Sequence, residues 1–224
     1  MKYVILRLSI FFFVSFFINY SIGQSYKPFW DEIKAFKKSD SLNKPAAHPI
    51  VFVGSSSFRK WTNVNEAFPG YPIINRGFGG STFPDVILYL NEIVFPYHPS
   101  QVVIYCGDND LASSDTMSAQ IVAKRFEDLF KQLRRKLPNS NIVFVSIKPS
   151  PSRRKLMPAM ESTNTLIKKF LSQKVNTAYA DVYHPMLDKK GEPLPYIFES
   201  DSLHMNSKGY DIWKRVLKPY LKKN

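Results

Sequence analysis

Short apolar runs alternate along the chain with longer amphipathic stretches. The runs are rich in β-branched and aromatic residues and are bounded mostly by Gly, Pro or Asn, as is typical of strands buried on both faces of a sheet. They cover residues 50–53, 73–75, 102–105, 142–147 and 177–180. The pattern therefore predicts five strands.

Helical periodicity fills the intervals between these strands. It is clearest over residues 118–137, where an apolar stripe lies along one side of the helix and Lys and Arg residues lie on the opposite side. The stripe consists of Ile121, Phe126, Leu129, Phe130 and Leu133. Further helices are predicted over residues 28–39, 84–93, 158–171 and 207–218, with Asn206 as the N-cap of the last helix and Pro219 as its stop.

Strands that alternate with helices predict a parallel sheet with right-handed crossovers and helices on both faces. Sites in such sheets form where the strands end, at the carboxyl edge. The residues that follow each strand are therefore the first place to look for chemistry.

The first 23 residues differ from the rest of the chain. Lys2 and Arg7 precede an apolar run over residues 8–18, and Ser21 and Gly23 place small side chains before a cleavage point. This is the build of a secretory signal peptide, and the run is short for a membrane span. We expect a signal peptide over residues 1–23 cleaved near Gly23, one domain over residues 24–224, and a secreted or periplasmic location. An uncleaved anchor is the alternative.

Composition agrees with one globular domain that carries a large positive charge. The 224 residues are 44% hydrophobic and 22% charged, which excludes a disordered chain and a multi-span membrane protein. The formal net charge is +13, and loss of Lys2 and Arg7 would leave 13 − 2 = +11. Because no nucleic-acid-binding motif accompanies the charge, we expect no nucleic acid and interpret the charge as a solvated basic surface. Peripheral contact with an anionic envelope, acidic glycans or phospholipid head groups is the alternative.

Two polar segments follow the first two predicted strands. Residues 54–58 read Gly-Ser-Ser-Ser-Phe, which places a serine hydroxyl on a tight turn at the sheet edge, near a helix N-terminus. Residues 75–82 read Asn-Arg-Gly-Phe-Gly-Gly-Ser-Thr, where glycines let a backbone N–H approach a ligand closely. Each segment alone is also explained by ordinary turn chemistry.

Two more polar segments lie further along the chain. Residues 107–110 read Gly-Asp-Asn-Asp, in which Asn109 presents a side-chain amide and Asp110 is expected to brace the loop. Asp201 stands three residues before His204, a spacing that lets a carboxylate orient an imidazole. Together the four segments supply a nucleophile, a base, an orienting acid and oxyanion donors.

In their order and context, Ser56, Gly80, Asn109 and His204 resemble the four blocks of the SGNH hydrolases, part of the GDSL esterase/lipase group. The resemblance spans roughly residues 50–215, which is most of the chain. It implies an α/β fold, a three-layer α/β/α sandwich of flavodoxin-like type, around a five-stranded parallel sheet.

The resemblance also implies a role for each residue. Ser56 would attack an ester carbonyl, His204 would accept the serine proton, and Asp201 would orient the imidazole. The backbone N–H groups of Ser56 and Gly80 and the side chain of Asn109 would form the oxyanion hole. No cofactor and no metal are implied, because Asp201 and His204 lack further ligands.

One position departs from the family pattern. Family members usually carry Asp directly before the nucleophile, and Ser55 stands there in this chain. Because Ser55 and Ser57 flank Ser56, the choice of nucleophile depends on its spacing from Gly54. The substitution removes a charge near the site and alters the bracing of the turn.

The implied activity is hydrolysis of a small-molecule, lipid or glycan ester. The motifs fit a lysophospholipase-like acylhydrolase and a carbohydrate O-deacetylase equally, with short acyl groups such as acetyl preferred. The rival hypothesis is a non-catalytic envelope- or glycan-binding module on the same fold. A further rival, an extracellular thioesterase or peptidase-like acylhydrolase, differs only in its leaving group. Loops over residues 147–157 and 183–199 would select the substrate. We interpret the basic residues Arg153, Arg154 and Lys155 as a solvated loop, with contact to a phosphate or an acidic sugar as the alternative.

The remaining reactive side chains have weaker claims to a site. His48, His98 and His184 lie beside prolines or turns and are interpreted as surface or turn residues. Cys106 is the single cysteine, so no internal disulfide forms, and its apolar surroundings predict a buried side chain.

Overall fold

Five parallel strands form the centre of the molecule in a computed structural model, which describes residues 27–223. The predicted signal peptide, residues 1–23, lies outside the described residues. The strands are β1 (Ile50–Gly54), β2 (Ile73–Gly77), β3 (Gln101–Tyr105), β4 (Asn141–Val145) and β5 (Thr177–Ala180). All five predicted strands are confirmed, with ends that move by two residues at most.

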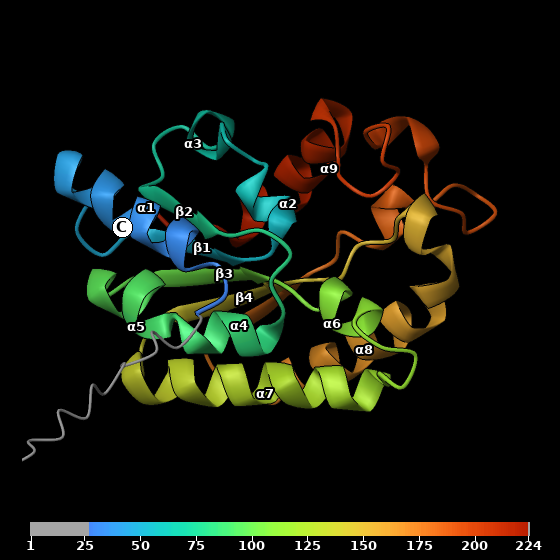
Figure 1. The fold of residues 1–224 in the computed structure, drawn as a ribbon, viewed down its shortest axis with the longest axis horizontal. Coiled ribbons are helices and arrows are strands. Elements are labelled where there is room, and N and C mark those ends of the chain that lie inside the picture. The colour runs from blue at the N-terminus through green and yellow to red at the C-terminus, as the bar shows by residue number, and fades with distance from the viewer. Residues whose placement is uncertain (1–26, 224) are drawn as a thin grey trace, which may run out of the picture.

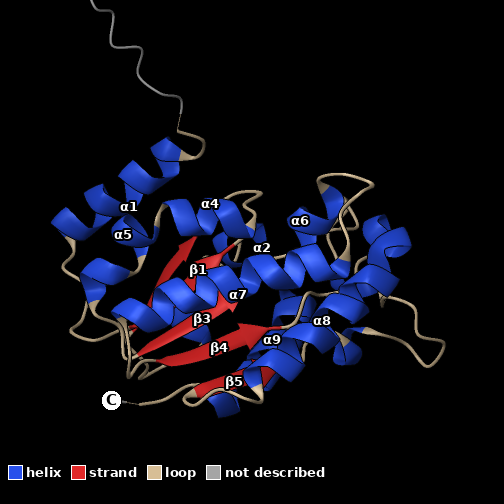
Figure 2. Ribbon diagram, turned by 90° about the horizontal axis from the view of Figure 1, so that it is seen from below, coloured by secondary structure: helices blue, strands red, loops and turns tan. Residues whose placement is uncertain are grey.

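The strand order is β2-β1-β3-β4-β5, and every neighbouring pair is parallel. This is the flavodoxin-like order, in which the connection from β2 to β3 passes over β1. The strand order reverses between β1 and β3. Figure 2 shows the strands pointing the same way, so the loops after β1, β2 and β3 share one edge of the sheet.

Helices cover both faces of the sheet (Figure 1). One layer contains α1 (Trp30–Leu42), α4 (Phe83–Leu88), α5 (Leu90–Ile93), α7 (Ala119–Lys136) and α8 (Met157–Leu171). The other contains α2 (Ser56–Arg59), α3 (Val64–Ala67) and α9 (Ser207–Leu217). The predicted three-layer α/β/α sandwich is therefore confirmed.

Shorter helical segments lie in the connections. Helix α6 (Asp108–Ala112) follows β3, and the 3₁₀ turns are η1 (Phe95–Tyr97), η2 (Pro151–Leu156), η3 (His184–Met186), η4 (Pro195–Ile197) and η5 (Lys218–Tyr220). Within residues 27–223, no helix has the length and apolar character that a membrane crossing requires.

Strand side chains alternate between two hydrophobic cores, as the two-residue period of a strand dictates. In β1, Val51 and Val53 enter the core beneath α4 and α7, whereas Ile50 and Phe52 enter the core beneath α2 and α9. Both sets are fully buried, which explains why the strands read as continuous apolar runs rather than alternating ones.

Two helix predictions are wrong in detail. The helix predicted over residues 84–93 is two helices, since the backbone at Tyr89 leaves helical geometry with φ −108° and ψ 9°. Ile121, which the sequence places in the apolar stripe of α7, is 42% exposed. Val122 occupies the buried position instead, four residues before Phe126 on the same helix face.

The predicted ends of α9 and the state of the cysteine agree with the structure. The Asn206 side chain accepts hydrogen bonds from the backbone N–H groups of Lys208 and Gly209, so Asn206 is the N-cap. The α-helix ends at Leu217, and Pro219 falls in the 3₁₀ turn that follows. Cys106 is fully buried, and burial raises the pKa of its thiol.

Candidate active site

Ser56 is the first residue of α2, directly after the turn that ends β1. The turn requires glycine at Gly54, which has φ +135° and whose added Cβ would lie 1.9 Å from the Tyr105 carbonyl oxygen of β3. Ser55 and Ser57 are buried beside it, whereas Ser56 is partly exposed. The fold thus gives the three neighbouring serines different environments.

Two side-chain contacts fix the turn from outside. The Asn75 side-chain amide donates to the Phe58 carbonyl oxygen at 2.7 Å, and the Tyr210 hydroxyl donates to the Ser57 carbonyl oxygen at 2.9 Å. Asn75 belongs to β2 and Tyr210 to α9. Elements from two distant parts of the chain therefore hold the backbone of α2 in place.

Asp201 and His204 lie on the loop between η4 and α9 and meet Ser56. His204 Nδ1 lies 2.6 Å from Asp201 Oδ2, and His204 Nε2 lies 3.0 Å from Ser56 Oγ. The imidazole is only 17% exposed, while the carboxylate reaches solvent. Residues 148 positions apart in sequence thus form one continuous hydrogen-bonded chain.

The Asp201 carboxylate determines the tautomer of the imidazole. Its bond to the His204 ring, and backbone N–H donors from His204 and Leu203 at 2.9 Å each, hold the pKa of Asp201 well below its usual range. An ionised carboxylate only accepts hydrogen bonds, so Nδ1 carries the ring proton. Nε2 of the neutral ring is then free to accept the hydroxyl proton of Ser56.

Gly80 lies in the loop between β2 and α4, at the same sheet edge. It has φ +55°, and a Cβ added there would meet no atom within 4 Å. The backbone N–H groups of Gly80 and Ser56 donate to no acceptor in the part of the chain that the structure describes. By contrast, the N–H of Gly79 donates to the Glu32 carboxylate at 3.2 Å. Unused donors at this edge are what an oxyanion requires.

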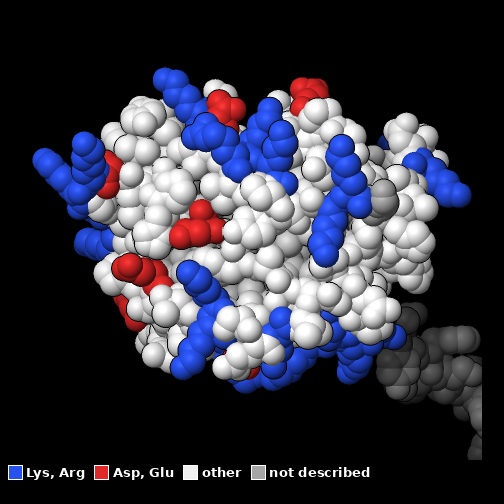
Figure 3. All heavy atoms as spheres, turned by 180° about the vertical axis from the view of Figure 1, so that it is seen from behind, with Lys and Arg blue, Asp and Glu red and all other residues white. Residues whose placement is uncertain are grey.

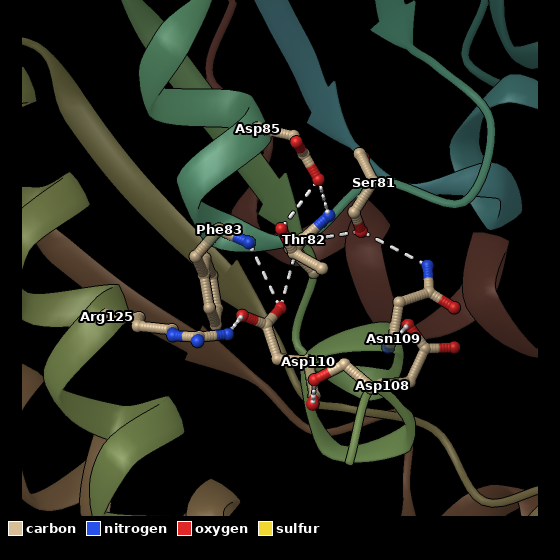
Figure 4. Close-up of polar contacts among 10 residues, drawn as sticks. Ser81, Thr82, Phe83, Asp85, Asp108, Asn109, Asp110 and Arg125 are labelled. Carbon is tan, nitrogen blue, oxygen red and sulfur yellow. Dashed lines mark hydrogen bonds and ion pairs between the residues drawn. The ribbon is translucent and has the colours of Figure 1, made fainter. Parts of the chain in front are cut away.

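The Asn109 side chain is held by three partners. Its Nδ2 group donates to Ser55 Oγ at 2.6 Å and to the Ser81 carbonyl oxygen at 3.1 Å, and its Oδ1 accepts from Arg153 Nη2 at 2.8 Å. Figure 4 shows the bond to Ser81. A guanidinium only donates and a carbonyl oxygen only accepts, so these contacts fix which way the amide points. Ser55 therefore supplies an uncharged acceptor for Asn109.

Asp110 braces the loop, as predicted. Its carboxylate accepts from the Phe83 backbone N–H at 3.0 Å and pairs with Arg125 at 2.8 Å (Figure 4). Burial raises the pKa of Asp110, against the lowering effect of Arg125 and of the Phe83 N–H. The contact joins the start of α4 to the start of α6.

The interpretation of residues 153–155 as a solvated loop is wrong for Arg153. Its side chain is 18% exposed and pairs with the buried carboxylate of Asp108 at 3.1 Å, besides its bond to Asn109. Arg154 forms a surface ion pair with Glu192. The sequence gives no signal for this difference, because the partners of Arg153 lie more than 40 residues away.

A second Asp-x-x-His segment has the same local geometry and no nucleophile. His184 Nδ1 lies 2.7 Å from Asp181 Oδ2, and Asp181 Oδ1 accepts from the backbone N–H groups of Tyr183 and His184. The His184 side chain is 66% exposed, as expected of a surface residue. No serine hydroxyl bonds to it in the described part of the chain, so this spacing alone does not make a site.

The other histidines occupy turns. His48 and His98 both have positive φ, and His48 Nδ1 lies 2.9 Å from the His98 carbonyl oxygen. Within residues 27–223, no three His, Cys, Asp or Glu side chains are grouped so that they could hold a metal ion.

Comparison with known proteins gives a family and a fold. The model of the GDSL-like lipase/acylhydrolase family matches residues 47–212. No curated protein matches the chain by sequence. The family match includes all five residues singled out above: Ser56, Gly80, Asn109, Asp201 and His204.

Several solved structures share the fold at low sequence identity. A Bacteroides fragilis protein provisionally assigned as an acylhydrolase is 20% identical, with a TM-score of 0.73 over 85% of this chain and 96% of that one. A GDSL-like lipase from Bacteroides thetaiotaomicron is 21% identical, with a TM-score of 0.70 over 84% and 96%. An acetylxylan esterase from Geobacillus stearothermophilus is 14% identical, with a TM-score of 0.61 over 78% and 95%.

Proposed function

This chain belongs to the GDSL-like lipase/acylhydrolase family, and from that premise we propose that it hydrolyses carboxylic esters with Ser56 as its nucleophile. The observation that carries the proposal is the 3.0 Å contact between His204 Nε2 and Ser56 Oγ, in a ring already oriented by Asp201. A hydroxyl beside a neutral imidazole nitrogen is the arrangement that nucleophilic acyl transfer needs.

Acylation begins when Ser56 Oγ attacks the ester carbonyl carbon and its proton passes to His204 Nε2. The carbonyl oxygen becomes an oxyanion, and the imidazolium is stabilised by the ionised carboxylate of Asp201. His204 then gives the proton to the leaving alcohol oxygen as the carbon–oxygen bond breaks. The product is an acyl ester on Ser56 and a free alcohol.

Deacylation repeats these steps with water in place of Ser56. His204 takes a proton from the water, whose oxygen attacks the acyl carbon, and returns that proton to Ser56 Oγ as the carboxylic acid leaves. No other reactant is needed, so the net reaction consumes one water for each ester bond.

The oxyanion would be bound by the backbone N–H groups of Ser56 and Gly80 together with the Asn109 amide. Within residues 27–223, the first two donors have no acceptor, which supports this role. Both hydrogens of Asn109 Nδ2 already have acceptors, and the uncharged Ser55 hydroxyl is the one that an oxyanion would outcompete.

The chain contains a matched control for testing the base. Replacing Ser56 or His204 with Ala should lower kcat for p-nitrophenyl acetate by about 10⁴- to 10⁶-fold. His184→Ala removes an imidazole with the same local Asp contact and should leave the rate unchanged. Loss of activity in both histidine variants, or in neither, would contradict the assignment, and circular dichroism of each variant checks that it is folded.

We propose that the acyl group is short, with acetyl as the leading candidate, on a glycan or lipid alcohol. The acetylxylan esterase with the same fold supports this choice, and a lysophospholipase-like activity is the competing one. The experiment compares kcat/KM for p-nitrophenyl esters from acetate to decanoate, and then for acetylated xylo-oligosaccharides and lysophospholipids. A rate that rises with chain length would refute the short-acyl proposal.

We also propose that the protein is exported and acts outside the cytoplasm. The charged start, apolar run and small residues before Gly23 support this. Lysine and arginine side chains are spread over the face shown in Figure 3 and outnumber the acidic ones there, which suits contact with an anionic envelope. N-terminal sequencing of the exported protein should begin near Gln24. An intact N-terminus in the membrane fraction would favour the anchor instead.

A further inference from the structure

Lys148 is a fully buried lysine beside the proposed catalytic base. It lies in the segment after β4 and is 1% exposed. Its ammonium group donates to the Leu203 carbonyl oxygen at 2.8 Å and lies 5.7 Å from the centre of the Phe198 ring. Burying a charged group is costly, so a buried lysine with a specific acceptor calls for an explanation.

Three successive carbonyl oxygens in the loop that carries His204 each accept a hydrogen bond. The Ser202 carbonyl oxygen accepts from the Ser152 N–H at 3.1 Å, and the Leu203 carbonyl oxygen accepts from the Lys148 ammonium. The His204 carbonyl oxygen accepts from the Glu199 N–H at 2.8 Å. Two of these donors are backbone groups, and Lys148 alone is a side chain. Lys148 is therefore the donor that carries a charge and that can titrate.

The Leu203 carbonyl and the His204 N–H belong to one peptide group, which is held at both ends. The carbonyl accepts from Lys148 at 2.8 Å, and the N–H donates to Asp201 Oδ1 at 2.9 Å. A cation on the carbonyl oxygen polarises the peptide and strengthens the bond that its N–H makes. The charge of Lys148 is thus coupled through one peptide group to the carboxylate that orients His204.

We propose that Lys148 is a positioning residue for His204, which it serves by holding the Leu203–His204 peptide group against Asp201. The inference rests on the proposed function, because it assigns Lys148 a part in orienting the base of that reaction. Displacing a reacting group by about 1 Å can cost up to about a hundredfold in rate, so a loosened loop should be visible in kinetics.

The charged groups around Lys148 decide when it loses its proton. Burial lowers its pKa to about 8, Asp108 and Asp201 act to raise it, and Arg153 acts to lower it further. Lys148 is therefore charged at neutral pH and loses its charge as the pH rises through about 8. An uncharged amine is a weaker donor. Activity should accordingly fall on the alkaline side with a midpoint near pH 8.

The same shift predicts an unusual relation between stability and activity. The pKa of Lys148 is lower in the folded protein than in the unfolded chain, so below about pH 8 its charge lowers the free energy of unfolding. This destabilisation disappears as the pH rises from about 8 towards 10.5. Lys148→Met removes the cost of the buried charge. We expect its Tm at pH 7 to be at least that of the wild type, while its activity falls.

The experiment compares the wild type with Lys148→Met, Lys148→Arg and a control, Lys208→Met. Lys208 is exposed at the start of α9, with its ammonium 5.8 Å from the centre of the Tyr196 ring. For each protein we would measure kcat and KM for p-nitrophenyl acetate from pH 5 to 10, the rate at which a fluorophosphonate labels Ser56, and Tm.

The expected result is a fall in kcat and in labelling rate of roughly tenfold to a hundredfold for Lys148→Met, with no lower Tm and no alkaline fall near pH 8. A folded Lys148→Met variant whose rate and pH profile match those of Lys208→Met would overturn the inference. If Lys148→Met does not fold, the Lys148→Arg variant decides, because its side chain stays charged over the whole pH range. An alkaline fall in its activity that is still near pH 8 refutes the inference. Loss of that fall supports it. A wild type that neither hydrolyses esters nor is labelled overturns the proposed function as well.

Discussion

Replacing Arg153 should weaken the proposed oxyanion donor Asn109, because Arg153 holds the side-chain amide of that residue. Arg153 Nη2 donates to Asn109 Oδ1 at 2.8 Å, and Nη1 pairs with the buried Asp108 at 3.1 Å. Lysine at this position keeps the positive charge beside Asp108 but loses the planar fork that reaches two acceptors at once. Arg153→Lys is therefore the more informative change, since Arg153→Met would also leave Asp108 buried without its counter-charge.

The size of the effect follows from the bond that is lost. A hydrogen bond to a charged group contributes about 1.5–3 kcal/mol, and here it favours the amide orientation in which Nδ2 faces the site. At about 1.4 kcal/mol for each factor of ten, the change should lower kcat by roughly tenfold to a hundredfold. KM should change little, because an oxyanion exists only in the transition state and the tetrahedral intermediate.

The assay is a double-mutant cycle on p-nitrophenyl acetate. Asn109→Ala alone should lower kcat by about 10²- to 10³-fold, as loss of one oxyanion donor does. If Arg153 acts through Asn109, then adding Arg153→Lys to Asn109→Ala should cost little more. Arg154→Lys is the matched control, because Arg154 pairs with Glu192 at the surface.

Two results would refute this reasoning. Effects of Arg153→Lys and Asn109→Ala that multiply in the double variant would mean that Arg153 acts independently of the amide. A rate for Arg153→Lys equal to that of Arg154→Lys would mean that the orientation of Asn109 does not depend on the guanidinium.

Three further predictions concern the framework of the site. Gly54→Ala should prevent folding, because its Cβ would lie 1.9 Å from a backbone oxygen. The Cβ of Gly70→Ala has open space, so that variant should lose only about 1–2 kcal/mol of unfolding free energy because of its positive φ. Soluble yield and urea unfolding distinguish the two variants. Ser55→Ala leaves one hydrogen of the Asn109 amide without its acceptor, so the free energy of unfolding should fall by roughly 1–3 kcal/mol, and an unchanged urea midpoint would count against that bond. Asn206→Ala removes the N-cap of α9 and should cost about 0.5–2 kcal/mol; an unchanged Tm would show that the cap contributes nothing.

Local patterns in the sequence were enough for the strands and for the ends of α9. A buried strand reads as an apolar run and an N-cap as a short polar side chain, and both signals lie within a few residues. The error in α7 arises where two neighbouring apolar residues could each occupy the buried position. Ile121 and Val122 are both apolar, and only packing against the sheet decided that Val122 is buried.

The order of the four blocks predicted the family, and the family model supports that prediction. Sequence spacing favoured Ser56 over Ser55 and Ser57, and the three side chains have different environments in the structure. The bracing role of Asp110 was also predicted, because Asp is a common turn residue that accepts backbone hydrogen bonds.

The two Asp-x-x-His segments have the same local hydrogen bonds, between Asp181 and His184 and between Asp201 and His204. The block resemblance favoured His204, and the tertiary structure shows that its ring is the one that contacts a serine hydroxyl. The hydroxyl of Ser56 lies beside one ring because the crossover connections bring the ends of distant elements to one edge of the sheet.

The contacts of Lys148 and Arg153 were likewise decided by the fold. Their partners, Leu203 and Asn109, lie 55 and 44 residues away. The sequence determined which segments are strands, which turns carry polar groups and which family they match, because those properties depend on near neighbours. Only the packed sheet decided which charges are buried and which carbonyl oxygens and amides they hold, because a hydrogen bond between distant residues leaves no trace in local spacing.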